Sequence, residues 1–182
     1  MYQKITFIIL FIFSNFCFAD DLISAAAQHT SSTPEFASET TQQEASNPTW
    51  SDKAQEVLIQ ALSLTGIQYK YGGSSPDTGF DCSGFVRYVF SQGAKITLPP
   101  TARAISQMGK TVKKEDLQPG DLVFFNTLKS TFSHVGIYLG DNKFIHAPRS
   151  GKTVTVENMN SDYWMKRFNG AQRLETEMHQ SQ

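Results

Sequence analysis

The chain has 182 residues, 40% of them hydrophobic, and a formal net charge of −1. This length and composition favour one domain with a hydrophobic core. From Trp50 onward, 15 Lys and Arg stand against 12 Asp and Glu. That excess of positive charge is too small to predict nucleic-acid binding, and no basic stripe with interleaved aromatic residues accompanies it.

The first 19 residues have the parts of a secretory signal peptide. Lys4 precedes an apolar run over residues 5–13, and the residues that follow fit a cleavage site after Ala19. The run of nine residues is too short to span a bilayer. A lipoprotein anchored through Cys17 is the alternative, which Phe16 disfavours because a small residue is expected there. We therefore expect export to the periplasm or cell envelope, with no membrane span.

The remaining chain divides into three parts by composition. Residues 20–49 are rich in Ser, Thr, Ala, Gln and Glu and carry only acidic charges. Such a segment cannot bury enough apolar surface to fold, which predicts a flexible linker. Residues 50–174 form the expected domain, and residues 175–182 form a polar C-terminal tail.

Within the domain, helices come first and strands follow. Ser51 and Asp81 are the expected N-caps of two helices that end before Gly66 and at Gly93. After Gly120, hydrophobic residues form the short or alternating runs typical of strands. The expected helices cover residues 51–65, 82–93 and 101–108, and the expected strands cover residues 122–125, 133–139, 143–147, 154–156 and 171–174.

Cys82 is the only cysteine left after the expected cleavage, so it has no disulfide partner. It stands at the first turn of the second helix, on the same face as Val86 and Val89. The unpaired N–H groups and the dipole at a helix start favour a reactive thiolate, whereas the charge of Asp81 opposes it. The alternative is that Cys82 is an ordinary small buried side chain.

His134 and His146 both lie on one predicted hairpin. If the turn is centred on Asp141, the two histidines are diagonal neighbours on the same face, within reach of each other. A two-residue turn at Asp141 and Asn142 would place them on opposite faces. The same-face arrangement therefore requires a three-residue turn or a bulge.

If that sheet face packs on the Cys82 helix, thiol and imidazoles line up for nucleophilic catalysis. His134 could take the Cys82 proton or hold it in an ion pair, and His146 could orient His134. Tyr69 could offer its hydroxyl to a developing oxyanion beside the Cys82 N–H. One Cys and two His could instead bind zinc, but their spacing lacks the short ligand pairs of most structural zinc sites. We expect neither a metal nor a cofactor.

Five separated blocks of sequence span nearly the whole domain: residues 69–73, 81–86, 119–122, 134–138 and 146–147. Together they resemble the signature of the NlpC-type bacterial cell-wall cysteine peptidases, and they stand in the family's order. Residues 163–167 further resemble the murein endopeptidase branch known as Spr or MepS.

This resemblance implies an α+β, papain-like fold, with the N-terminal Cys82 helix packed on an antiparallel sheet. It also implies Cys82 as the nucleophile, His134 as the base and His146 as the third catalytic residue. The implied oxyanion or substrate contacts are Tyr69, Ser83 and Asp81.

Two features depart from the family pattern. Pro100 stands where many relatives carry Arg, and Arg103 is the candidate replacement. A lipid anchor is also not evident in the sequence.

The implied activity is a thiol-dependent peptidoglycan endopeptidase that acts on stem peptides. We favour the cross-link between D-alanine and meso-diaminopimelate, with the bond between D-glutamate and diaminopimelate as the alternative. A non-catalytic wall-binding module, or a thiol acyltransferase or amidase of the same fold, are the alternatives from other classes. The expected partner is peptidoglycan, and the expected state is a monomer.

Overall fold

The computed structural model describes residues 49–127 and 130–174. The predicted signal peptide, the linker up to residue 48 and the tail lie outside the described residues. Within the described ranges, every helix is too short or too polar to cross a bilayer.

Helix α1 (Trp50–Ser63) opens the domain, and its N-cap is Thr49. Thr49 and Asp52 form a reciprocal capping box, in which the Asp52 N–H donates to Thr49 Oγ1 and the Thr49 N–H donates to Asp52 Oδ2. The predicted cap at Ser51 is therefore wrong by two residues, because Ser51 already lies in the first turn.

A short hairpin of β1 (Ser74–Ser75) and β2 (Gly79–Phe80) replaces the predicted loop and leads into α2 (Cys82–Gly93). Helix α2 begins after Asp81 and ends at Gly93, as predicted. The next elements are α3 (Ala102–Ile105), which is shorter than expected, the unpredicted strand β3 (Lys110–Val112) and a 3₁₀ helix η1 (Lys114–Asp116).

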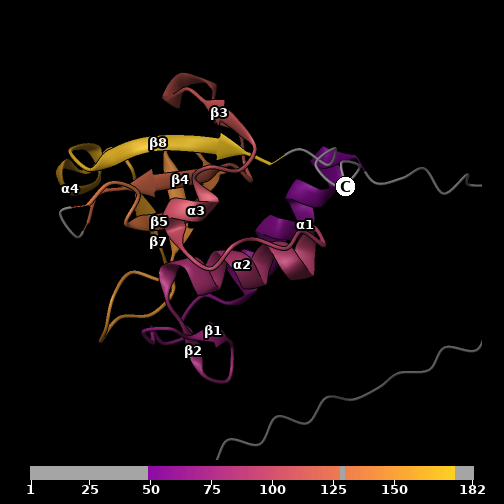
Figure 1. The fold of residues 1–182 in the computed structure, drawn as a ribbon, viewed down its shortest axis with the longest axis vertical. Helices are drawn as coiled ribbons and strands as arrows, with labels where there is room; N and C mark the ends of the chain where they lie inside the picture. The colour runs from indigo at the N-terminus through magenta and orange to yellow at the C-terminus, as the bar shows by residue number, and fades with distance from the viewer. Residues whose placement is uncertain (1–48, 128–129, 175–182) are drawn as a thin grey trace, which may run out of the picture. The chain divides into compact units, whose positions relative to one another are not determined.

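The main sheet has six antiparallel strands in the order β3-β8-β4-β5-β6-β7. Its remaining strands are β4 (Leu122–Phe125), β5 (His134–Gly140), β6 (Lys143–His146), β7 (Thr155–Asn158) and β8 (Phe168–Arg173). The short helix α4 (Asp162–Met165) connects β7 to β8. Figure 1 shows α1 and α2 together on one side of this sheet.

The central strands β4, β5 and β6 are largely buried on both faces. On one face, Val135 and Ile137 of β5 belong to the core that includes Phe85 and Val89 of α2. On the other face, Tyr138 belongs to an aromatic cluster that is completed by Phe125, Phe144 and Trp164. The predicted α+β architecture, with the cysteine helix on an antiparallel sheet, is confirmed.

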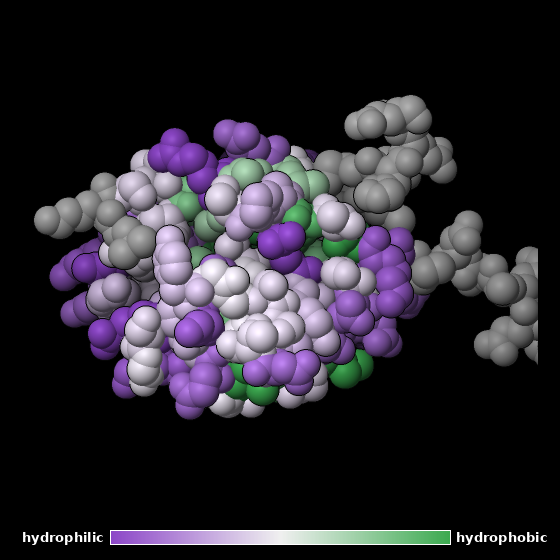
Figure 2. Space-filling view, turned by 60° about the horizontal axis from the view of Figure 1, so that its bottom comes forward, coloured by the Kyte–Doolittle hydropathy of each residue, from purple (hydrophilic) through white to green (hydrophobic). Residues whose placement is uncertain are grey.

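The outer surface is mostly polar where Figure 2 shows it, with hydrophobic residues in small, separate patches. Ile59 and Leu62 of α1 are among the exposed hydrophobic residues, at 63% and 49% exposure.

The β5–β6 hairpin contains both a two-residue turn and a bulge. Asp141 and Asn142 form the turn with φ angles of 49° and 56°, typical of a tight hairpin turn. Gly140 pairs with Lys143 across it, but the register shifts between Gly140 and Tyr138, which pairs with Phe144. The extra residue of the bulge restores the register that places both histidines on one face.

Candidate active site

His134 and His146 form a buried hydrogen-bonded pair. Nε2 of His134 lies 2.7 Å from Nδ1 of His146, and the two rings are nearly perpendicular at 87°. Their exposed fractions are 4% and 0%. Trp164 stacks on the His134 ring at 5.7 Å and meets the His146 ring edge to face at 5.0 Å. The expected same-face arrangement of the two histidines is therefore present.

Cys82 approaches β5 from the sheet face opposite to the one that we expected. Helix α2 packs on the sheet face that carries Val135, whereas the histidines face Trp164 on the other side. The assumption that the histidine face packs on the cysteine helix is therefore wrong. Cys82 still meets β5, because it is the first residue of α2 and the main chain of Val135 hydrogen-bonds to it. Val135 directly follows His134, so the thiol and the imidazole come to the same end of β5.

The thiol of Cys82 is neutral at pH 7 in the free protein. Burial, and then the negative charge of Asp81, raise its pKa to about 11, although hydrogen bonds from the main chain of Val135, Ser83 and Cys82 itself lower it. The dipole of the helix start, which favours a thiolate, is therefore outweighed here. Desolvation of the charged form outweighs the local dipole.

The two imidazoles are also neutral. Burial lowers the pKa of His134 to about 4, an effect that Asp81 partly opposes. Burial, and then His134, lower the pKa of His146 well below its ordinary value. A resting thiolate–imidazolium pair is thus disfavoured, and the arrangement suits proton transfer during the reaction.

Asp81 and Ser83 shape the loop around Cys82. One carboxylate oxygen of Asp81 accepts the Gly84 N–H at 2.7 Å and the Ser83 hydroxyl at 3.0 Å, and the other accepts the Gly72 N–H at 3.0 Å. The Ser83 hydroxyl also lies 2.9 Å from the carbonyl oxygen of Pro100. Both side chains are thus engaged within the protein, and it is the main chain of Ser83 that contacts the sulfur.

Tyr69 lies close to the thiol. Its pKa is raised by burial first, and then by the nearby charges of Cys82 and Asp81. Its N–H donates to the Lys152 carbonyl at 2.8 Å, which ties this segment to the loop after β6. Arg103, the candidate replacement near Pro100, donates instead to the Thr131 hydroxyl at 2.8 Å.

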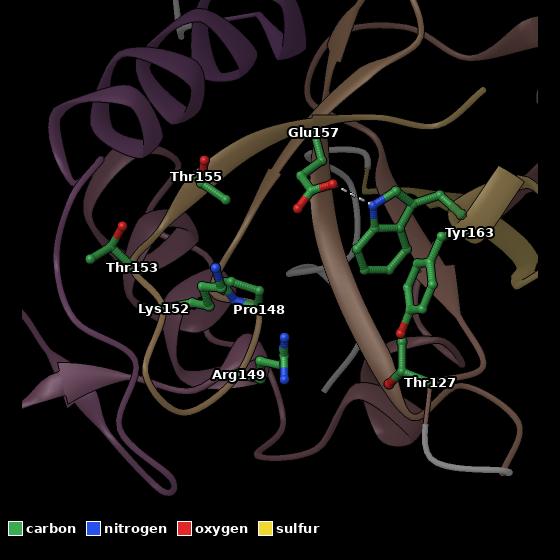
Figure 3. Close-up of a pocket in the computed structure, with 9 residues that line it drawn as sticks. Thr127, Pro148, Arg149, Lys152, Thr153, Thr155, Glu157 and Tyr163 are labelled. Carbon is green, nitrogen blue, oxygen red and sulfur yellow. Dashed lines mark hydrogen bonds between the residues drawn. The ribbon is translucent and has the colours of Figure 1, made fainter. Parts of the chain in front are cut away.

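A cavity of about 690 Å³ lies beside the histidine pair. Figure 3 shows Pro148, Arg149 and Lys152 of the β6–β7 connection on one side and Tyr163 with Thr127 on the other. Glu157 belongs to its wall and accepts the Trp164 Nε1–H at 2.8 Å. The lining residues are Thr127, Pro148, Arg149, Lys152, Thr153, Thr155, Glu157, Tyr163 and Trp164.

Sequence reasoning missed the link between this cavity and the histidines. Glu157 Oε1 lies 3.9 Å from His146 Nε2, because β7 pairs with β6 and places the two residues near each other. The sequence offered only residues 163–167, which were used for the resemblance to the murein endopeptidase branch and not for a site. Within residues 49–127 and 130–174, no group of three or more His, Cys, Asp or Glu could hold a metal ion.

Comparison with known proteins gives consistent matches. Over 128 residues the chain is 41% identical to the murein DD-endopeptidase MepH of Escherichia coli. The aligned region covers 68% of this chain and 47% of MepH. Over 123 residues it is 40% identical to the murein DD-endopeptidase/LD-carboxypeptidase MepS of the same organism, with 68% and 64% covered. Over 120 residues it is 43% identical to the gamma-DL-glutamyl hydrolase of Bacillus subtilis, with 65% and 29% covered. The chain thus spans less than two thirds of the length of each of these relatives.

The fold is shared with solved structures as well. The crystal structure of an NlpC/P60 family protein from Bacillus cereus matches with a TM-score of 0.64 and 34% identity, over 70% of this chain and 41% of that one. This match supports the papain-like fold predicted from the sequence blocks. The model of the NlpC/P60 family matches residues 66–173, which include Tyr69, Cys82, His134 and His146. The chain therefore belongs to the NlpC/P60 family.

Proposed function

We propose that this protein is a cysteine peptidase that hydrolyses stem peptides of peptidoglycan. The observation that carries the proposal is the buried His134–His146 pair, together with the main-chain hydrogen bond to Cys82 from Val135, the residue that follows His134 on β5. Membership of the NlpC/P60 family and the activities for which the relatives are named support it. The same family context supports an exported protein that works in the periplasm or cell envelope after cleavage behind Ala19.

In the proposed mechanism, His134 is the base and Cys82 the nucleophile. His134 uses Nε2 for His146, which leaves Nδ1 to take the thiol proton. The sulfur forms a bond to the scissile carbonyl carbon, and the negative charge moves to the carbonyl oxygen. The Cys82 N–H and the Tyr69 hydroxyl stabilise this oxyanion.

The intermediate then collapses in two stages. The C–N bond breaks as the proton on His134 passes to the leaving amine, which leaves a thioester on Cys82. Water then attacks the thioester, gives a proton to His134 and releases the new carboxylate. The proton returns to the Cys82 sulfur and restores the neutral pair.

For the bond cut, we favour the cross-link between D-alanine and meso-diaminopimelate. MepH and MepS, both named murein DD-endopeptidases, support this choice. The gamma-DL-glutamyl hydrolase of Bacillus subtilis supports the bond after D-glutamate at a similar identity. The sequence identities alone therefore do not distinguish the two bonds, so product analysis is needed to identify the bond that is cut.

Digestion of purified muropeptides with residues 20–182 tests both the activity and the bond. Conversion of cross-linked dimers to intact monomers, followed by mass spectrometry, is the expected result. Monomers shortened to a dipeptide stem would establish the alternative bond. Binding to sacculi without any new product would contradict the peptidase proposal and favour a wall-binding module.

Arg149 and Lys152 are suited to bind a carboxylate of the substrate. Both line the cavity, and within the described parts of the chain neither side chain forms an ion pair or a hydrogen bond. Stem peptides carry free carboxylates at their D-amino acids. We expect the double variant Arg149→Gln/Lys152→Gln to raise KM by about 3- to 10-fold with little change in kcat, since exposed charge pairs contribute modestly.

The matched control for this double variant is Lys143→Gln, an exposed lysine on β6 that does not line the cavity. Kinetics on a soluble stem peptide should show an unchanged KM for the control. An unchanged KM for the double variant as well would remove the cavity from the substrate-binding site.

A further inference from the structure

His146 has one ring nitrogen, Nε2, that takes no part in the hydrogen bond with His134. Its Nε2 is buried and has no hydrogen-bond partner among the described residues. The nearest anion is Glu157, whose Oε1 lies 3.9 Å away. Buried polar atoms are normally paired, so an unpaired one beside a carboxylate points to a contact that forms at another stage.

The protonation pattern of the pair determines which atom His146 must use. If His134 Nδ1 is to accept a proton from Cys82, the neutral His134 ring must carry its hydrogen on Nε2. That hydrogen is donated to His146 Nδ1 at 2.7 Å, so His146 must accept there and carry its own hydrogen on Nε2. The reactive state therefore places an N–H donor at the atom that faces Glu157.

We propose that Glu157 is a positioning residue that accepts this Nε2–H of His146 and so fixes the tautomers of both histidines. The inference rests on the proposed peptidase function. Glu157 also supplies the negative charge that stabilises the imidazolium formed on His134, relayed through His146. It acts through the histidines and forms no bond in the reaction itself.

The surroundings of Glu157 fit this role. Its Oε2 is held by the Trp164 indole N–H at 2.8 Å, and the same indole packs on both histidine rings. The Glu157 side chain is 42% exposed and lies on the cavity wall. A small rotation of this side chain would bring Oε1 closer to His146. Substrate in the cavity excludes water from the carboxylate and strengthens the contact.

Three kinds of group surround Glu157. His146 faces it from β6, Tyr163 and Trp164 from α4, and Arg149 and Lys152 from the other side of the cavity. Because the carboxylate favours the protonated histidine pair, its removal should shift the acid limb of kcat/KM to lower pH.

Two substitutions test the proposal. Glu157→Gln keeps an acceptor for Trp164 but removes the charge, and we expect kcat to fall about 3- to 10-fold. Glu157→Ala removes the acceptor, and we expect a fall of about 10- to 100-fold, in both cases with KM changed less than about 2-fold. The control is Glu115→Gln, an exposed glutamate of η1, which should leave kcat unchanged.

The second readout does not depend on activity. Histidine ¹⁵N NMR of the wild-type protein should show His146 protonated at Nε2, and Glu157→Ala should lose that preference while its melting curve remains cooperative. If wild type hydrolyses nothing, the proposed function fails, but the tautomer measurement still decides the role of Glu157. Wild-type kcat together with an unchanged His146 tautomer in Glu157→Ala would overturn the inference.

Discussion

Replacing Cys82 by Ser is expected to reduce hydrolysis of peptidoglycan by about 10³-fold or more, while the protein keeps its fold. The side chain changes by one atom at a partly buried position, so packing of α2 is retained. The chemistry changes far more. A hydroxyl holds its proton much more tightly than a thiol, and His134, with a pKa lowered to about 4, is too weak a base to remove it.

Three measurements together test the nucleophile. Muropeptide digestion gives the rate, thermal unfolding shows whether the variant remains folded, and alkylation with iodoacetamide gives the matched control. Alkylation should inactivate the wild-type protein and leave Cys82→Ser unmodified, because Cys82 is the one cysteine of the chain after the expected cleavage. A folded Cys82→Ser protein that digests muropeptides at the wild-type rate would mean that another group attacks the peptide.

The start and end of the cysteine helix could be predicted because they depend on local sequence. Asp81 stands three residues before Gly84, whose N–H it accepts, and the helix ends at Gly93. Both features require only neighbouring residues. The first helix shows the limit of this reasoning, since Thr49 and Ser51 are both acceptable caps and only the capping box with Asp52 favours Thr49.

The charge state of the thiol could not be predicted in the same way. A helix start lowers a cysteine pKa through local dipoles, but burial is a tertiary property that depends on which elements cover the side chain. In this fold α2 packs against β5 and places Cys82 next to Val135. The resulting desolvation raises the pKa of the thiol to about 11.

The sequence pattern also could not predict which face of the sheet packs against α2. Alternation along β5 places His134 and Tyr138 on one face and Val135 and Ile137 on the other. Because both faces are buried, the pattern does not indicate which of them packs against α2. The link from His146 to Glu157 depends on the β6–β7 pairing across an irregular connection. Such long-range pairing leaves no short-range signal.

Replacing His134 by Gln should be nearly as damaging as replacing Cys82. The Gln amide can still donate to His146 Nδ1, as Nε2 of the imidazole does at 2.7 Å, but it has no nitrogen that can accept a proton from the thiol. We expect kcat/KM to fall about 10³-fold at neutral pH. A fall of less than about 10-fold in a folded His134→Gln protein would show that His134 is not the base.

The same variant should change how stability depends on pH. In the folded protein the pKa of His134 is lowered to about 4 from an ordinary value of 6.5, so between these values the unfolded chain binds more protons than the folded one. Stability is therefore complete above about pH 6.5 and decreases as the pH falls toward 4, by about 3 kcal/mol from this residue if its burial persists. His134→Gln removes this contribution, so its urea midpoint should fall less between pH 7 and pH 4 than that of wild type. An equal fall in both proteins would show that His134 is already solvated or charged in the native state, which is incompatible with a buried neutral base.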